Sequence, residues 1–298
     1  MPMGTESFDS RYKALDTRDS RDVLAAILDA QQRGVDAVRS RIDAIAEAAD
    51  AAAARLRGSP TGRLVYAGAG TSVRLGVQDG VELTPTFGWP TNRLAFAIAG
   101  GMDALTRAIE GAEDDRVAGA AAIVDQQVGR DDVCIAVSAS GGTPYTCAAA
   151  AKARERGALT ITIANNAGSP LLAAGDHPIL IDSGAEPVAG STRMTAGTTQ
   201  KIVLNLLSTL IMIRLGRVYD GLMVDVIATN DKLVLRSLAM LREITGIDEP
   251  AARQALAATA GHVKLAVLVA DGLTADAGRL LLERHGGDLR AARAAARR

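Results

Sequence analysis

"YAGAGTSVRLGVQDGVELTPTFGWP", residues 66–90, runs from the end of an apolar segment through a glycine-rich turn into a helical pattern. Residues 63–70 have the composition of a short buried strand that ends in glycines, and residues 71–83 have the spacing of a helix. A strand that leads through glycines straight into a helix is typical of a βα unit. This stretch therefore predicts the start of an α/β fold.

The rest of the central region repeats the same alternation. Apolar runs predict four more strands, and helical patterns stand between them at residues 102–111 and 144–157. Strands that are apolar on both sides and alternate with helices indicate a parallel sheet covered on both faces. We expect the further strands within residues 93–101, 131–140, 159–165 and 177–183.

Helical patterns flank this region on both sides. Residues 20 to about 57 form one long helix or two shorter ones, and "GSPTG" (58–62) ends them. From about residue 197 the pattern is helical again, and the last fifty residues resemble a small helical bundle. We therefore expect an N-terminal helical segment over 1–58, an α/β domain over 59–245 and a C-terminal helical domain over 246–298.

The composition argues against several classes of protein. The formal net charge is −1 and aromatic residues make up 3%, which speaks against a nucleic-acid partner. The two cysteines form no CxxC motif or Cys/His cluster, so we predict neither a metal nor a disulfide framework. The N-terminus has no apolar signal region and no run of about 18 apolar residues occurs. We expect a soluble cytoplasmic protein with no membrane partner.

Two predicted strands end in the same kind of turn, "GAGTSVR" and "SASGGTPY". Each places hydroxyls and backbone N–H groups just before a helix, where unsatisfied donors and a partial positive charge favour an anion. One interpretation is a phosphate site; the other is that the hydroxyls only cap helices and form turns. The candidate phosphate-binding residues are Thr71, Ser72, Ser138, Ser140 and Thr143.

Common nucleotide and nucleophile motifs are missing from the sequence. Val73 occupies the position at which a GxGxxG fingerprint needs its third glycine, and neither a P-loop nor a GxSxG elbow occurs. No histidine belongs to a recognisable triad, so carboxylates would have to move protons in an enzyme. Glu82 and the acids of "AIEGAEDD" are candidates, although an acid near a helix end is usually a solvated charge.

These blocks together resemble the N-acetylmuramic acid 6-phosphate etherase family, which has the sugar isomerase (SIS) fold. The resemblance covers most of the chain and rests on several blocks in order. They include "TESFDSRYKALD", "IAGGMDAL", "EGAEDD", "SASGGTPY", "GSTRMTAGTTQKIVLNLLST", "GRVYDGLMVDVIATNDKLVLRS" and "GHVKLAVL", besides residues 66–90.

The resemblance implies an activity and a site. Such enzymes cleave the lactyl ether of N-acetylmuramic acid 6-phosphate to N-acetylglucosamine 6-phosphate and D-lactate in peptidoglycan recycling, as homodimers without a cofactor. By resemblance Glu82 is the acid and Glu113 the base, with Glu110 as a fallback, and Ser191 and Thr192 lie near the sugar. We expect the apolar flank of Glu82 to desolvate its carboxyl, so that it keeps its proton.

The chain departs from the family pattern at Val73, Gly142 and Thr195, where the family usually has Gly, Arg and Lys. Fewer cations would weaken the binding of a doubly anionic substrate. Two alternatives follow: a sugar-phosphate-binding regulatory protein without activity, and a related lyase or isomerase with another sugar phosphate. The presence of both Glu82 and Glu113 favours an enzyme.

Overall fold

The computed structural model describes residues 4–226 and 231–297. Packing divides the chain into two compact units: Met1–Val81 with Asn92–Leu210, and Glu82–Thr91 with Ile211–Arg298. The helices α3 (Gly70–Phe87) and α7 (Thr195–Arg214) each contribute residues to both units. The domain bounds at residues 58 and 245 stay a prediction.

The first unit contains a five-stranded parallel sheet with the strand order β2-β1-β3-β4-β5. Strands β1 and β3 are buried along their whole length, because helices cover both faces and leave no side for polar residues. The five predicted strands are confirmed as β1 (Leu64–Gly68), β2 (Leu94–Ile98), β3 (Val133–Ser138), β4 (Leu159–Ala164) and β5 (His177–Leu180).

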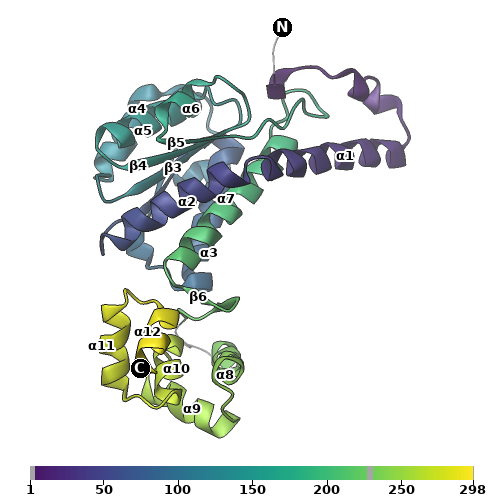
Figure 1. Cartoon of the computed structure of the whole chain (residues 1–298). Helices are drawn as coiled ribbons and strands as arrows, with labels where there is room; N and C mark the ends of the chain where they lie inside the picture. The colour runs from purple at the N-terminus through teal and green to yellow at the C-terminus, as the bar shows by residue number, and fades with distance from the viewer. Residues whose placement is uncertain (1–3, 227–230, 298) are drawn as a thin grey trace. The chain divides into compact units, whose positions relative to one another are not determined.

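Helices form a layer on each face of this sheet (Figure 1). One layer consists of α4 (Arg116–Asp125), α5 (Pro144–Glu155) and α6 (Pro170–Ala174), while α2 (Ile42–Arg57) and α7 lie on the other face. By length and composition α7 could cross a membrane, but 56% of its apolar window is buried inside the structure. Burial on that scale is typical of a core helix.

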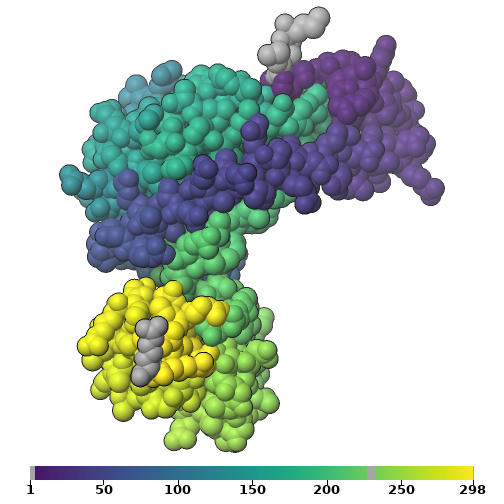
Figure 2. All heavy atoms as spheres, viewed as in Figure 1, coloured from purple at the N-terminus to yellow at the C-terminus, as the bar shows by residue number. Residues whose placement is uncertain are grey.

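The N-terminal segment starts with short 3₁₀ turns and continues as two helices, which settles the choice between one and two. These elements are η1 (Gly4–Glu6), η2 (Ser10–Tyr12), η3 (Leu15–Thr17) and α1 (Ser20–Arg39), followed by α2. Asp19 caps α1 by accepting hydrogen bonds from two backbone N–H groups. The segment is the purple part of the surface in Figure 2.

Two expected elements differ in the structure. Helix α3 continues past residue 83 to Phe87, although Pro85 cannot donate a hydrogen bond to the preceding turn. Gly88 ends the helix in the left-handed conformation at φ +63°, where the N–H groups of Gly88 and Trp89 bond to the carbonyl oxygens of Thr84 and Leu83. The helix expected at 102–111 is only a 3₁₀ turn, η5 (Met102–Leu105). Ala104 and Leu105 of this turn pack against Val73 and Ile98, while Met102 and Ile109 stay exposed.

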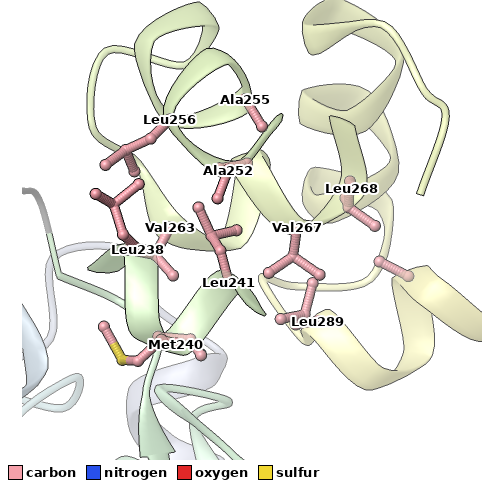
Figure 3. Close-up of a cluster of buried hydrophobic side chains, with 13 residues drawn as sticks. Leu238, Met240, Leu241, Ala252, Ala255, Leu256, Val263, Val267, Leu268 and Leu289 are labelled. Carbon is pink, nitrogen blue, oxygen red and sulfur yellow. The ribbon is translucent and has the colours of Figure 1, made fainter. Parts of the chain in front are cut away.

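The second unit is the small helical bundle expected at the C-terminus, together with a short antiparallel pair, β6 (Val218–Tyr219) and β7 (Leu222–Met223). Figure 3 shows Leu241, Val267 and Leu289 directed toward one another in its core. The helices are α8 (Asp231–Thr245), α9 (Glu249–Ala258), α10 (Val263–Ala270), α11 (Ala275–Arg284) and α12 (Leu289–Ala296).

Candidate active site

The candidate site lies where the strand order of the sheet reverses. The chain passes from β1 outward to β2 and then returns to β3 on the other side of β1. Gly68 at the end of β1 is paired with Val137 near the end of β3, so the turns that follow these strands meet at one edge. Ligands of open parallel sheets bind at such a switch point, beyond the carboxyl ends of the strands.

A cavity of about 480 Å³ opens at this edge. We call it the hydroxyl cavity, because hydroxyl side chains from three loops line it, and its size suits a ligand of a few hundred daltons. The predicted site residues that line it are Thr71, Ser72, Glu113, Ser138, Ser140, Thr143 and Thr192.

The hydroxyls after β3 form one hydrogen-bonded group. The Oγ of Ser138 lies 2.8 Å from the Oγ1 of Thr143 and accepts a bond of 3.1 Å from the Gly141 N–H. The Oγ of Ser140 accepts a bond of 3.1 Å from the Gly142 N–H. These bonds fix the oxygen positions before any ligand is present, which lowers the cost of ordering them on binding.

The capping interpretation can be tested at Thr143, which is the N-cap residue of α5. Its side chain makes no capping hydrogen bond and contacts Ser138 instead. Asp115, in contrast, does cap the neighbouring helix α4 by accepting a bond from the Ala118 N–H. The N-terminal N–H groups of α5 therefore lack a side-chain cap, which favours the anion-binding interpretation.

Glu113 reaches the hydroxyl cavity because α4 and α5 approach each other closely. A Cβ at Gly119 of α4 would lie 2.3 Å from the carbonyl oxygen of Tyr145 in α5, so only glycine fits there. The turn η6 (Ala112–Asp114) directly precedes α4 and is held beside the start of α5. Glu113 is exposed and lines the cavity, whereas Glu110 lines only a neighbouring cavity of about 340 Å³.

The loop before α7 brings Thr192 to the same cavity. The buried carboxylate of Glu186 accepts bonds of 2.8 Å from the N–H groups of both Thr195 and Ala196 and so caps α7. This cap holds the preceding loop in place. Ser191, predicted to lie near the sugar, does not line the hydroxyl cavity in the single chain.

Two further acids line the cavity: Asp114, one of the candidate acids of "AIEGAEDD" without an assigned role, and Glu6, which is not a predicted site residue. Glu6 is held there by its neighbour Thr5, which exchanges hydrogen bonds with the side chain of Asn166 after β4. No spacing rule points to Glu6, because it lies in a short N-terminal turn far from the sheet in sequence. The block "TESFDSRYKALD" was its only signal.

The charges around the hydroxyl cavity are unusual for an anion site. Three carboxylates line it, those of Glu6, Glu113 and Asp114, and none of its described lining residues is a lysine or an arginine. An anion in this cavity would therefore depend on hydroxyls, backbone N–H groups and the positive ends of α3 and α5.

Glu82 does not line the hydroxyl cavity. It lies on α3, ten residues after Ser72, which corresponds to about 15 Å along the helix axis. The expectation that apolar neighbours desolvate it is wrong for the single chain, where Glu82 is exposed. Successive residues of a helix point about 100° apart, so Leu83 is buried while Glu82 faces outward.

The three departures from the family pattern have different surroundings. Val73 is 2% exposed and packs with Ile98 and Ala104, so it does not narrow the hydroxyl cavity. Gly142 lines the cavity, and a Cβ there would find only the Ser140 Oγ within 4 Å, at 3.8 Å. Thr195 is fully buried, and its Oγ1 has no hydrogen-bond partner.

In comparisons with known proteins, the chain matches two SIS-domain models and full-length relatives of one name. Residues 117–210 match the SIS domain, and residues 44–153 match the glucokinase regulatory protein N-terminal SIS domain. The chain is 49% identical to the N-acetylmuramic acid 6-phosphate etherase of Deinococcus radiodurans, over 97% of this chain and 94% of that one. It is 46% identical to the enzyme of that name in Streptomyces avermitilis, over 99% and 94%.

Solved structures are similar over part of the chain. A phosphoheptose isomerase from Francisella tularensis superposes with a TM-score of 0.46 and 15% identity, over 65% of this chain and 98% of that one.

Proposed function

The chain belongs to the N-acetylmuramic acid 6-phosphate etherase family, and from this premise we propose how its own residues carry out the reaction. It cleaves the D-lactyl ether of N-acetylmuramic acid 6-phosphate and releases D-lactate and N-acetylglucosamine 6-phosphate. In this proposal the 6-phosphate binds the hydroxyls of Ser72, Ser138, Ser140 and Thr143, with Thr71 and Thr192 beside the sugar.

The chemistry is an elimination followed by a hydration. In the open-chain sugar the C2 proton is acidic, because it is α to the C1 aldehyde. A carboxylate removes it, the C3–O bond breaks, and a carboxylic acid protonates the departing lactate oxygen. Water then adds to C3 of the unsaturated aldehyde. Two carboxyl groups in different environments can divide the acid and base roles.

One observation carries this proposal: Glu113 and the hydroxyls of Ser138 and Thr143 line the same cavity. A sugar held by its phosphate at the start of α5 has its other end free to approach a carboxylate in that cavity. We assign Glu113 the role of the base. Its exposure leaves the carboxylate open to a substrate that enters the cavity.

The acid requires a second copy of the chain in this proposal. Glu82 is exposed and does not line the cavity in the single chain, and Val81 beside it is 48% exposed. A homodimer with two-fold symmetry would cover this exposed surface and bring Glu82 of one copy to the cavity of the other. Burial against a partner would also desolvate the carboxyl of Glu82.

The test is the release of D-lactate from N-acetylmuramic acid 6-phosphate by Glu113→Gln and Glu110→Gln. We expect the first variant to lose activity by at least about 10²-fold, because proton transfer by a side chain contributes that much. The second should stay near the wild type, because Glu110 lines only the neighbouring cavity. Equal loss in both variants, or normal activity of Glu113→Gln, would remove Glu113 from the mechanism.

A regulatory protein without activity is the second candidate, because residues 44–153 match the glucokinase regulatory protein N-terminal SIS domain. Such a protein would bind a sugar phosphate in the hydroxyl cavity and release nothing. Formation of a ketose phosphate would point instead to an isomerase. Lactate release identifies the etherase, and formation of a ketose phosphate separates an isomerase from a regulator. We propose that the reaction serves peptidoglycan recycling in the cytoplasm.

A further inference from the structure

The second unit contains a cavity of its own, of about 500 Å³. Apolar side chains, among them Leu215, Val224 and Val226, make up part of its lining. Three cations also line it, Arg217, Lys264 and Arg279, against a single carboxylate, that of Asp225. We call it the Lys264 cavity. Apolar walls with a few convergent polar groups are typical of a small-molecule site.

Lys264 is buried far more deeply than is usual for a lysine, with 8% of its surface exposed. Among the described residues its ion-pair partner is Asp225, whose Oδ2 lies 3.2 Å from the Nζ. Burial is the main cause that lowers the pKa of Lys264, and the nearby carboxylates oppose it only in part. One long contact leaves most of the hydrogen-bonding capacity of a three-donor ammonium group unused.

Arg217 does not supply the missing hydrogen-bond partners of Lys264. It is a second cation, and it competes for the carboxylate of Asp225. Its Nη1 lies 2.9 Å from Asp225 Oδ2 and donates bonds of 2.8 and 2.9 Å to the carbonyl oxygens of Phe87 and Gly88. Its guanidinium also lies over the Trp89 ring, 5.0 Å from the centroid. Arg217 thus has a structural role at the end of α3, and the unbalanced charge remains with Lys264.

The start of α10 adds more positive potential to the same cavity. His262 is the N-cap residue and makes no side-chain capping bond, and the next three residues, Val263 to Leu265, line the cavity with it. Their N–H groups have no partner within the helix. A buried ammonium at the positive end of a helix is unfavourable unless an anion is present.

We propose that the Lys264 cavity binds a small monocarboxylate. The carboxylate would accept hydrogen bonds from Lys264 and from the N–H groups at the start of α10, while its short apolar body contacts Leu215 and Val226. Among the lining residues, the two enclosed cations exceed the single carboxylate by one charge, while Asp288 outside the lining offsets part of that excess. A small positive excess favours a monoanion over a phosphate dianion. Arg279 has a side chain that is 61% exposed and attracts the anion from outside.

D-lactate is the natural candidate for this monocarboxylate. The choice of D-lactate rests on the proposed function, whereas the inference that the Lys264 cavity binds a monocarboxylate does not. If this product binds in the second unit, the occupancy of the Lys264 cavity would rise as lactate accumulates. The binding test uses no sugar substrate and no turnover. It can therefore succeed if the etherase assignment fails, and fail if that assignment holds.

The experiment is a titration of the full-length protein with sodium D-lactate, followed by NMR of the histidine side chains. His262 lines the cavity, and His177 of β5 in the first unit is an internal control. We expect a saturable shift of the His262 signals, no shift of His177, and weaker binding of inorganic phosphate. No shift of His262 would overturn the proposal, and tighter binding of phosphate would overturn the assignment to a carboxylate.

Two variants make the test specific. Lys264→Met removes the buried charge at similar length, and we expect at least about a tenfold loss of lactate affinity, since a hydrogen bond to a charged group is lost. Arg279→Gln changes a side chain that is 61% exposed and pairs with Asp276, and it should weaken binding about two- to fivefold. Unchanged affinity in both variants would contradict the proposed site even if the first one folds poorly.

Discussion

At the scale of single residues, we expect removal of the Thr143 hydroxyl to affect substrate binding as well as the free energy of unfolding. It bonds to Ser138 and makes no capping bond, so Thr143→Val should lower the free energy of unfolding by no more than that one hydrogen bond, about 1 kcal/mol. The same change should raise KM for the sugar phosphate about three- to tenfold, because one hydrogen bond to the phosphate is lost. Urea unfolding and lactate-release kinetics measure the two effects.

Thr274 offers the matched control, because its hydroxyl does cap a helix. The Ala277 N–H donates a bond of 3.2 Å to the Thr274 Oγ1 at the start of α11. Thr274→Val should therefore cost about 1 kcal/mol of stability and leave KM unchanged. If Thr143→Val destabilised the protein as much as Thr274→Val and left KM alone, the Thr143 hydroxyl would have a structural role only.

Gly142 is a second single residue at which substrate binding can be tested. Its surroundings leave room for a side chain, and the described lining of the hydroxyl cavity includes no lysine or arginine. Gly142→Arg should lower KM for the sugar phosphate about three- to tenfold, since a guanidinium can pair with a phosphate. The gain should shrink as salt is added. Gly142→Gln is the uncharged control; the same gain from glutamine would show that charge is not the cause.

At the scale of elements, Asp132 joins the starts of β1 and β3, the two strands that end at the hydroxyl cavity. It accepts bonds from the N–H groups of Arg63 and Gly129, and its Oδ2 lies 2.8 Å from the Arg63 guanidinium. Burial on its own would raise the pKa of Asp132, but Arg63 and the N–H bonds outweigh it, so the pKa lies below 3.8.

The sign of the pH effect follows from this lowered pKa. The stabilising contribution of Asp132 is complete above the unfolded pKa and is lost as the pH falls through the folded one. Asp132→Asn should therefore cost about 2 kcal/mol at pH 7 and flatten the loss of stability below about pH 4. Glu155 forms an exposed pair with Lys152, so Glu155→Gln should leave the fall in stability at low pH, the acid limb of the stability curve, unchanged. An unaltered acid limb in Asp132→Asn would refute this assignment.

At the scale of the whole molecule, the proposed dimer predicts complementation between inactive variants. Glu82→Gln and Glu113→Gln should each be inactive alone. A mixed dimer would combine Glu82 of one chain with Glu113 of the other in one intact site. Random exchange makes half of the dimers mixed, each with one of two sites active, so about a quarter of wild-type activity should return. Mixing without any recovery would mean that both glutamates act from one chain.

The sequence by itself determined the class of fold and most of the hydroxyl cavity. Strands that are covered on both faces must be apolar throughout, so the sequence predicted β1 and β3. Parallel strands bring the turns after them to one edge of the sheet. That rule alone predicted that Ser72, Ser138 and Thr143 lie close together. The resemblance to the etherase family supplied the roles of the two glutamates.

Other features depended on contacts between residues that are distant in the chain. Glu6 reaches the cavity because its neighbour Thr5 bonds to Asn166 and to the Gly190 N–H, and Lys264 is buried because the second unit folds around it. The exposure of Glu82 follows from which face of α3 meets the core, which its apolar sequence neighbours do not reveal. Local patterns specify helices, strands and turns, whereas burial and charge pairing arise from the assembled structure, and these decide how a titratable group behaves.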